Sequence, residues 1–245
     1  MIKVFKDSFE LAHQIFPRGG SCLEFGVYVG QTFVWQAKRI QKTHEHSTLI
    51  GFDSWQGLPE EEHGVWAPSR HMAGKYSSAK DIVLEKLRGI HMAQDSRIRF
   101  VDGFFSESLT EDIRKKIDNV IFINIDVDIY KSTIELLDFV KPLLRPGVVI
   151  YWDDWKDPKD VHEGDWGEHL AWDNWNRANP DIEAETIEVN PLNQRYMVIS
   201  KANGKTLESE GLSLYKIRQS AFAISNENPT LTDRAKKVAK KILGR

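Results

Sequence analysis

Cysteine is almost missing from this sequence of 245 residues, in which Cys22 is the single example. One cysteine excludes an intrachain disulfide and a metal site built from several thiolates. The residues around it, SCLEFGV, are mostly apolar. We therefore expect Cys22 to be a small buried residue of a strand rather than a reactive thiol.

Long apolar runs and an excess of positive charge are missing as well. No apolar run approaches the length that spans a bilayer, and the first stretch, MIKVFKDSFELAHQIF, lacks the apolar centre of a signal peptide. The formal net charge is -3, so no basic field favours nucleic acid as a partner. These features predict a cytoplasmic protein that does not bind nucleic acid.

The sequence does contain 41% hydrophobic residues, which is enough for a sizeable core. Short apolar runs alternate with segments of helical periodicity, and this alternation predicts a parallel sheet with right-handed crossovers and helices on both faces. A hairpin is expected to close the edge of the sheet. The expected strands span 22–27, 48–53, 98–103, 120–126, 148–154, 182–189 and 194–201, and the expected helices span 32–41, 79–90, 106–117, 132–144 and 167–179.

Two segments exceed this minimal fold. Residues 56–78 form a polar stretch that is long for a connection, and we expect it to be a lid. Residues 205–245 follow the last strand, and we expect two added helices there, as an extension of a main domain that spans 1–204. The final helix has an apolar stripe opposite lysines. It is expected to pack on the domain or on a second subunit of a homodimer, with weak contact to an anionic membrane surface as the alternative.

Carboxylates end two of the buried strands. Asp126 ends the run 120–126, while Asp153 and Asp154 end the run 148–154. If these strands are neighbours about 4.8 Å apart, the acids converge at one edge of the sheet, with Asp128 just beyond. Like charges that close repel each other unless a cation or a shared proton intervenes. Oxygen ligands suit Mg²⁺ or Mn²⁺, although some of these acids could instead cap the following helices.

The first two strands end in features that suggest a bound cofactor. Glycines at 26 and 30 lead into a helix at Thr32, which permits close backbone approach to a ligand. Asp53 follows roughly 20 residues later, at the spacing where a carboxylate binds ribose hydroxyls. The alternative for Asp53 is a role in a turn or as a helix cap. The third strand ends at Asp102 and Gly103, a position that often borders a nucleoside base.

Four stretches together, EFGVYVG, GFDSWQGLP, IDVDIYKST and RPGVVIYWDDW, resemble the macrocin O-methyltransferase (TylF-type) family over roughly residues 20–200. The resemblance implies the Rossmann-like class I methyltransferase fold, an α/β fold with a seven-stranded, mostly parallel sheet of order 3-2-1-4-5-7-6. It also implies a metal-dependent enzyme that transfers a methyl group from S-adenosylmethionine to a sugar hydroxyl.

The resemblance further implies roles for individual residues. Asp126, Asp153 and Asp154 match the metal ligands, and Asp128 matches the general base. Glu24, Gly26 and Asp53 match cofactor positions, to which we add their neighbours in sequence and the other strand ends, namely Gly30, Thr32, Ser54, Asp102, Gly103 and Asp126. The cofactors expected are therefore S-adenosylmethionine and Mg²⁺ or Mn²⁺.

The acceptor is expected to be a small molecule or a glycan. His71 and Tyr76 of the lid and Tyr130 and Trp155 near the acids could contact it, although a polar loop residue can equally be only solvated. Five tryptophans follow the fifth strand or lie at its end, and they suit either a sugar or core packing; they are Trp152, Trp155, Trp166, Trp172 and Trp175. The rival functions are methylation of an aromatic diol, hydrolysis of a phosphoester, and non-catalytic binding of S-adenosylmethionine.

Overall fold

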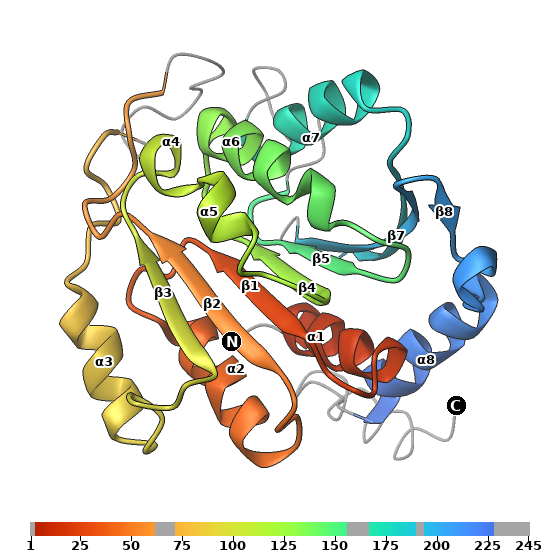
Figure 1. Ribbon diagram of the computed structural model, residues 1–245, viewed down its shortest axis with the longest axis horizontal. Coiled ribbons are helices and arrows are strands. Elements are labelled where there is room, and N and C mark those ends of the chain that lie inside the picture. The colour runs from red at the N-terminus through yellow and green to blue at the C-terminus, as the bar shows by residue number, and fades with distance from the viewer. Residues whose placement is uncertain (1–2, 62–71, 156–166, 190–193, 228–245) are drawn as a thin grey trace, which may run out of the picture.

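A computed structural model describes residues 3–61, 72–155, 167–189 and 194–227, and its centre is an eight-stranded sheet (Figure 1). The strand order is β3-β2-β1-β4-β5-β7-β6, with β8 paired to β7, so the predicted order 3-2-1-4-5-7-6 is confirmed. The first five strands pair in parallel, and β7 is antiparallel to β5, β6 and β8. The strands are β1 (Ser21–Phe25), β2 (Thr48–Asp53), β3 (Ile98–Asp102), β4 (Val120–Ile125), β5 (Val149–Trp152), β6 (Glu183–Val189), β7 (Arg195–Ala202) and β8 (Lys205–Thr206).

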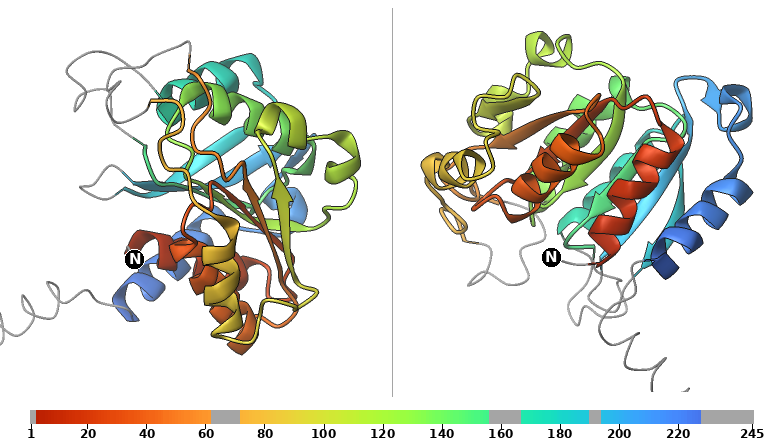
Figure 2. Two further views of the ribbon diagram at one scale, coloured as in Figure 1. Left: turned by 90° about the vertical axis from the view of Figure 1, so that its left-hand side faces the viewer. Right: turned by 90° about the horizontal axis from the view of Figure 1, so that it is seen from below.

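Helices cover both faces of this sheet (Figure 2). One face carries α1 (Lys3–Ile15), α2 (Gln31–Lys42), α3 (Lys80–Arg88) and α8 (Leu214–Glu227). The other face carries α4 (Phe105–Ser108), α5 (Glu111–Arg114), α6 (Tyr130–Val140) and α7 (Gly167–Ala178). The described residues also contain two short 3-10 turns, Lys141–Leu143 and Glu208–Glu210.

The strand residues alternate between the two helical layers, so most side chains of a central strand are apolar and buried. In β1, Cys22 packs with the layer that contains α1 and α2, while Leu23 packs with the layer that contains α6. Phe122 and Ile123 of β4 divide in the same way. All four side chains are fully buried. The prediction that Cys22 is a buried strand residue is thus confirmed, and burial raises the pKa of its thiol.

The helices differ from the expectation in two places. The helix α1 was not predicted, yet Phe5 and Phe9 bury it against β4 and β5 through edge-to-face contacts with Phe122 and Tyr151. The single helix expected over 106–117 is two short helices instead. Thr110 separates them, because its side-chain oxygen accepts a hydrogen bond from the backbone N–H of Ile113 and so starts α5 anew.

The C-terminal part is described as far as residue 227. One of the two added helices is confirmed as α8, which packs beside α1 through Ile217, Ala221 and Ile224. The amphipathic helix expected over 231–243 lies outside the described residues, and the division of the chain at residue 204 stays a prediction. Within the described ranges, no helix is both long enough and apolar enough to cross a membrane.

Candidate active site

The two strands that end in acids are neighbours, as predicted. β4 and β5 pair in parallel, with Ile125 opposite Trp152. The backbone N–H of Asp126 donates to the carbonyl of Phe25, and that of Asp153 donates to the carbonyl of Ile125, both at 3.0 Å. The hydrogen-bond ladder of the sheet therefore continues into both acids. It brings their carboxylates to the same edge of the sheet.

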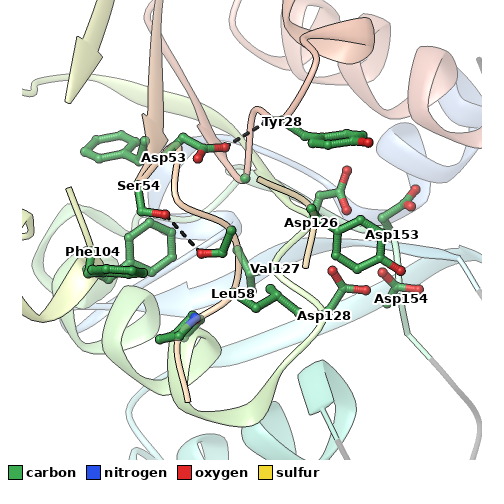
Figure 3. A pocket seen from close by; sticks show the side chains of 17 residues that line it. Tyr28, Asp53, Ser54, Leu58, Phe104, Asp126, Val127, Asp128, Asp153 and Asp154 are labelled. Carbon is green, nitrogen blue, oxygen red and sulfur yellow. Dashed lines mark hydrogen bonds between the residues drawn. The ribbon is translucent and has the colours of Figure 1, made fainter. Parts of the chain in front are cut away.

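Four carboxylates gather at this edge, on one side of a cavity (Figure 3). One oxygen each from Asp126, Asp128 and Asp154 lies within 4.8 Å of the other two. Asp153 has further partners, since its Oδ1 accepts hydrogen bonds from the hydroxyl of Tyr151 at 2.6 Å and from Nε2 of Gln194 at 2.7 Å. The assignment of Asp153 as a ligand and of Asp128 as a base stays a prediction. The distances would also allow Asp128 to share a cation with Asp126 and Asp154.

The electrostatics of this group favour a cation. Burial, followed by the charges of Asp153, Asp154 and Asp128, raises the pKa of Asp126 well above its usual range. Burial also raises the pKa of Asp153, although the hydrogen bonds from Tyr151 and Gln194 oppose that rise. A divalent ion would relieve this repulsion. The donors are oxygen atoms only, so the residues present fit a hard ion such as Mg²⁺ or Mn²⁺.

Asp128 is not the cap residue of α6, which was the alternative role for these acids. The N-terminal cap residue of α6 is Ile129, whose side chain makes no capping hydrogen bond. Glu61 of segment 56–78 instead accepts a hydrogen bond from the backbone N–H of Lys131 at 2.8 Å. Asp128 has a left-handed backbone with φ of 61°. This conformation is uncommon for residues other than glycine and is better tolerated by Asp and Asn, and it turns the chain between the strand and α6.

The glycine loop after β1 is shaped by Asp53. Oδ2 of Asp53 accepts hydrogen bonds from the backbone N–H groups of Val27 at 2.7 Å and Tyr28 at 2.8 Å, while Oδ1 accepts one from Trp55 at 2.7 Å. Asp53 thus stabilises the turn through its side chain, which was the alternative role predicted for it. It also lines the cavity, where it could meet a ligand.

The cavity has a volume of about 330 Å³ and joins the two predicted sites. The predicted residues on its wall are Gly26, Asp53, Ser54, Tyr76, Asp126, Asp128, Asp153 and Asp154. A second cavity of about 270 Å³ lies beyond Tyr28 and is lined by Thr32. Tyr28, Asp126 and Asp153 line both cavities, so the two meet beside the acids.

Other predicted cofactor residues lie off the wall of the main cavity. Glu24 is fully buried beneath the loop, where it accepts a hydrogen bond from Thr32 Oγ1 at 2.8 Å and another from Gln36. Burial raises the pKa of Glu24 to about 8. Asp102 accepts hydrogen bonds from Lys80 Nζ at 2.7 and 2.8 Å and from Trp55 Nε1 at 2.9 Å. Cofactor contacts of these residues, and of Gly30 and Gly103, stay predictions.

The acceptor residues are placed in different environments. Tyr76 lines the cavity and makes an edge-to-face contact with Tyr28, at 5.9 Å between ring centroids. The hydroxyl of Tyr130 accepts a hydrogen bond from Asn174 Nδ2 at 3.3 Å. Trp155 is 2% exposed and packs against Trp152 in the core. Direct contact of Tyr130 and Trp155 with an acceptor stays a prediction.

The tryptophans favour core packing over a sugar platform. Trp152, Trp155, Trp172 and Trp175 are all buried in one cluster that lies between the sheet and α7. Trp166 and His71 lie outside the described residues, as do residues 62–71 of the expected lid.

Sequence reasoning missed three polar side chains of the site. Tyr151 and Gln194 bond to Asp153, and Glu168 at the start of α7 is fully buried and bonds to the loops that carry the acids. Burial, followed by the charge of Asp154, raises the pKa of Glu168 well above its usual range. A glutamate in the first turn of a helix is ordinary in sequence, and nothing in the pattern distinguishes this one.

The sheet order and the acid-lined cavity at the carboxyl ends of its strands define a Rossmann-like methyltransferase fold. A family model described as a methyltransferase domain matches residues 23–155. This match spans more than half of the chain, and the chain belongs to that methyltransferase domain family. The TylF-type subgroup stays a resemblance.

Two curated relatives are O-methyltransferases of Streptomyces. The chain is 25% identical over 141 residues to 8-demethyl-8-(2,3-dimethoxy-alpha-L-rhamnosyl)-tetracenomycin-C 4'-O-methyltransferase of Streptomyces olivaceus. It is 26% identical over 143 residues to demethyldecarbamoylnovobiocin O-methyltransferase of Streptomyces niveus. Each alignment covers 56% of this chain and 53% of the relative. The chain thus matches about half the length of these curated relatives.

Solved structures share the fold over a longer range. The O-methyltransferase NovP superposes with a TM-score of 0.65 at 22% identity, covering 83% of this chain and 81% of that one. A calicheamicin methyltransferase superposes with a TM-score of 0.61 at 18% identity, covering 82% and 79%. At these identities the likeness shows the fold alone.

Proposed function

We propose that this chain is an O-methyltransferase that transfers a methyl group from S-adenosylmethionine to a sugar hydroxyl of a glycoside, assisted by a divalent cation. The observation that carries the proposal is the shared cavity. Its wall combines the carboxylates of Asp126, Asp128 and Asp154 with the loop residues Gly26 and Asp53. One set suits a hard cation and the other suits a nucleoside.

The glycine loop would bind the cofactor. Asp53 would accept hydrogen bonds from the ribose hydroxyls, in keeping with its place on the cavity wall. Gly26 would let the cofactor approach the backbone. The two cavities on either side of Tyr28 would then take the nucleoside end and the amino-acid end of one extended molecule.

The acids would hold the cation and move the proton. Asp126 and Asp154, with Asp153 or Asp128 as a further ligand, would bind Mg²⁺ or Mn²⁺, which when bound lowers the pKa of a hydroxyl and orients it. The carboxylate of Asp128 would accept the hydroxyl proton. In the same step the carbon–sulfur bond of the sulfonium breaks and the new carbon–oxygen bond forms, which leaves S-adenosylhomocysteine.

The acceptor class is argued from the curated relatives. One of them is named for a rhamnosyl tetracenomycin and the other for a novobiocin precursor. We extend a glycoside acceptor to this chain on that likeness. The aromatic residues Tyr28 and Tyr76 at the cavity support this choice, because rings of this kind pack against the C–H faces of sugars.

The test uses S-adenosylmethionine with a labelled methyl group and two acceptor panels, one of rhamnosides and one of catechols. Label should enter the rhamnosides, stop with excess chelator, and return with Mn²⁺. Asp154→Asn should need more Mn²⁺ for the same rate. If label enters the catechols and not the rhamnosides, the proposed acceptor class is wrong. Full activity in excess chelator would contradict the role of the cation.

A further inference from the structure

A buried glutamate bridges the two loops that carry the acids. Glu168 is the second residue of α7, and its side chain is 0% exposed. Its Oε1 accepts a hydrogen bond from the backbone N–H of Val127 at 3.0 Å. Its Oε2 accepts one from the backbone N–H of Asp154 at 3.3 Å. One carboxylate therefore contacts two segments that are far apart in the sequence.

Each of these amides lies inside the acidic group. Val127 stands between Asp126 and Asp128, and Asp154 follows Asp153. A shift of either amide moves the neighbouring carboxylates with it. The two hydrogen bonds of Glu168 thus fix the loop after β4 relative to the loop after β5, beyond the point where the sheet ladder ends.

The helix that carries Glu168 is itself held firmly. Gly167 packs against the loop so closely that a β-carbon there would lie 2.5 Å from the carbonyl oxygen of Asp128. Farther along α7, Trp172 and Trp175 are buried in the core against α6 and the sheet. The packing of α7 therefore holds the carboxylate of Glu168 in place independently of the two loops.

The position is costly for a carboxylate. Burying a charge away from water is unfavourable unless hydrogen bonds or counter-charges compensate it. Here the neighbours Asp126, Asp128 and Asp154 carry the same sign. An apolar residue would suit core packing alone, whereas a carboxylate can meet each of the two amides with a separate oxygen, as Glu168 does.

We propose that Glu168 is a positioning residue that sets the spacing of Asp126, Asp128 and Asp154 for a divalent cation. This inference rests on the proposed function. It does not require Glu168 to touch the ion, the cofactor or the acceptor, because it acts through the backbone of the two loops.

The test compares Glu168→Gln with the control Asp173→Asn in the full chain. Glutamine has nearly the same size, but its NH₂ group cannot accept from a backbone N–H, so one of the two bonds is lost. Asp173 lies on the same helix, has a side chain that is 46% exposed, and pairs with His169. Mn²⁺ affinity is measured by titration, affinity for S-adenosylhomocysteine by calorimetry, and stability by thermal unfolding.

Glu168→Gln should weaken Mn²⁺ binding by about 10- to 100-fold, the range found for residues that orient metal ligands. Its affinity for S-adenosylhomocysteine should stay within about twofold of wild type, since the glycine loop is untouched. Asp173→Asn should change neither affinity. Unchanged Mn²⁺ binding in Glu168→Gln would overturn the proposal, and so would a parallel loss of both affinities, which indicates a general structural role.

Two further outcomes separate this inference from the proposed function. Wild-type protein that binds Mn²⁺ but not S-adenosylhomocysteine contradicts the proposed function and leaves the positioning role supported by the Mn²⁺ result. Wild-type protein that binds no Mn²⁺ overturns both. If Glu168→Gln does not fold, Glu168→Asp replaces it. The shorter carboxylate keeps the charge but cannot span both amides, so unchanged Mn²⁺ affinity in that variant also overturns the positioning role.

Discussion

Gly26 faces the backbone carbonyl of Asp126 so closely that a β-carbon at position 26 would lie 1.8 Å from its oxygen. The loop that would bind the cofactor and the first acid of the cation group are therefore in direct backbone contact. Gly26 also has a left-handed backbone, with φ of 84°. Both constraints are met by glycine and by no other residue.

Gly26→Ala should disturb both sites. The overlap forces the loop away from β4, and we expect a loss of about 3 kcal/mol in the free energy of unfolding, together with weaker binding of S-adenosylhomocysteine. Gly74→Ala is the matched control, because Gly74 has φ of 78° and no atom within 4 Å of its β-carbon position. That variant carries only the backbone strain, about 1 kcal/mol. Equal losses in urea unfolding of the two variants would contradict the role of the close contact.

Asp53→Ala should weaken binding of S-adenosylhomocysteine by at least about tenfold, because the proposed hydrogen bonds to the ribose would be lost together with those to the loop amides of Val27 and Tyr28. Asp53→Asn separates the two effects in part, since its side chain has the same shape but only one acceptor oxygen. Calorimetry on both variants gives the measurement. Binding of NAD with no response to S-adenosylmethionine would contradict the methyltransferase function.

A divalent cation should stabilise the wild-type protein, since it offsets the burial and the neighbouring charges that raise the pKa of Asp126. At 100 times its dissociation constant, Mn²⁺ should add about 2.7 kcal/mol to the free energy of unfolding. Asp154→Asn should reduce this gain at the same concentration. Thermal unfolding with and without Mn²⁺ checks it, and an equal shift in the variant would mean that the ion binds elsewhere.

Asp126→Asn and Asp128→Asn should have different kinetic effects. Asp126→Asn should raise the Mn²⁺ concentration for half activity. If Asp128 is the base, Asp128→Asn should lower kcat by about 10² to 10⁴ and leave Mn²⁺ affinity nearly intact. Asparagine tolerates the left-handed backbone at 128, so the fold is preserved. A large loss of Mn²⁺ affinity in Asp128→Asn would instead identify Asp128 as a ligand, as its closeness to Asp126 and Asp154 allows.

Glu24 should make stability depend on pH. Its pKa is raised by burial from 4.5 to about 8, so the folded protein favours the protonated form. The stability that this adds is complete below pH 4.5 and is lost as the pH rises to about 8. Relative to Glu24→Gln, wild type should lose up to about 1.4 kcal/mol per pH unit in this window. Urea unfolding across the pH range measures the difference, and parallel curves would show that Glu24 ionises normally.

Sequence patterns were informative where a side chain belongs to a strand. The closeness of Asp126 and Asp153 could be predicted from the sequence, because neighbouring parallel strands place their ends at one edge of the sheet. The contact of Glu168 with the two acid loops could not be predicted. A helical pattern indicates which face of a helix is buried, but not which buried atom contacts a distant loop. Helix α1 has a helical signal in the sequence, because Val4, Phe5, Phe9 and Ala12 recur at helical spacing and are buried.

The continuation of the ladder into Asp126 and Asp153 bears on how such a protein can change during evolution. Their backbone N–H groups are held by main-chain hydrogen bonds to Phe25 and Ile125, which lie outside segment 56–78. The described parts of segment 56–78, residues 56–61 and 72–78, contribute Tyr76 to the cavity but no strand to the sheet. Substitutions, insertions or deletions there can therefore change the cavity wall while the main-chain bonds that hold Asp126 and Asp153 are kept.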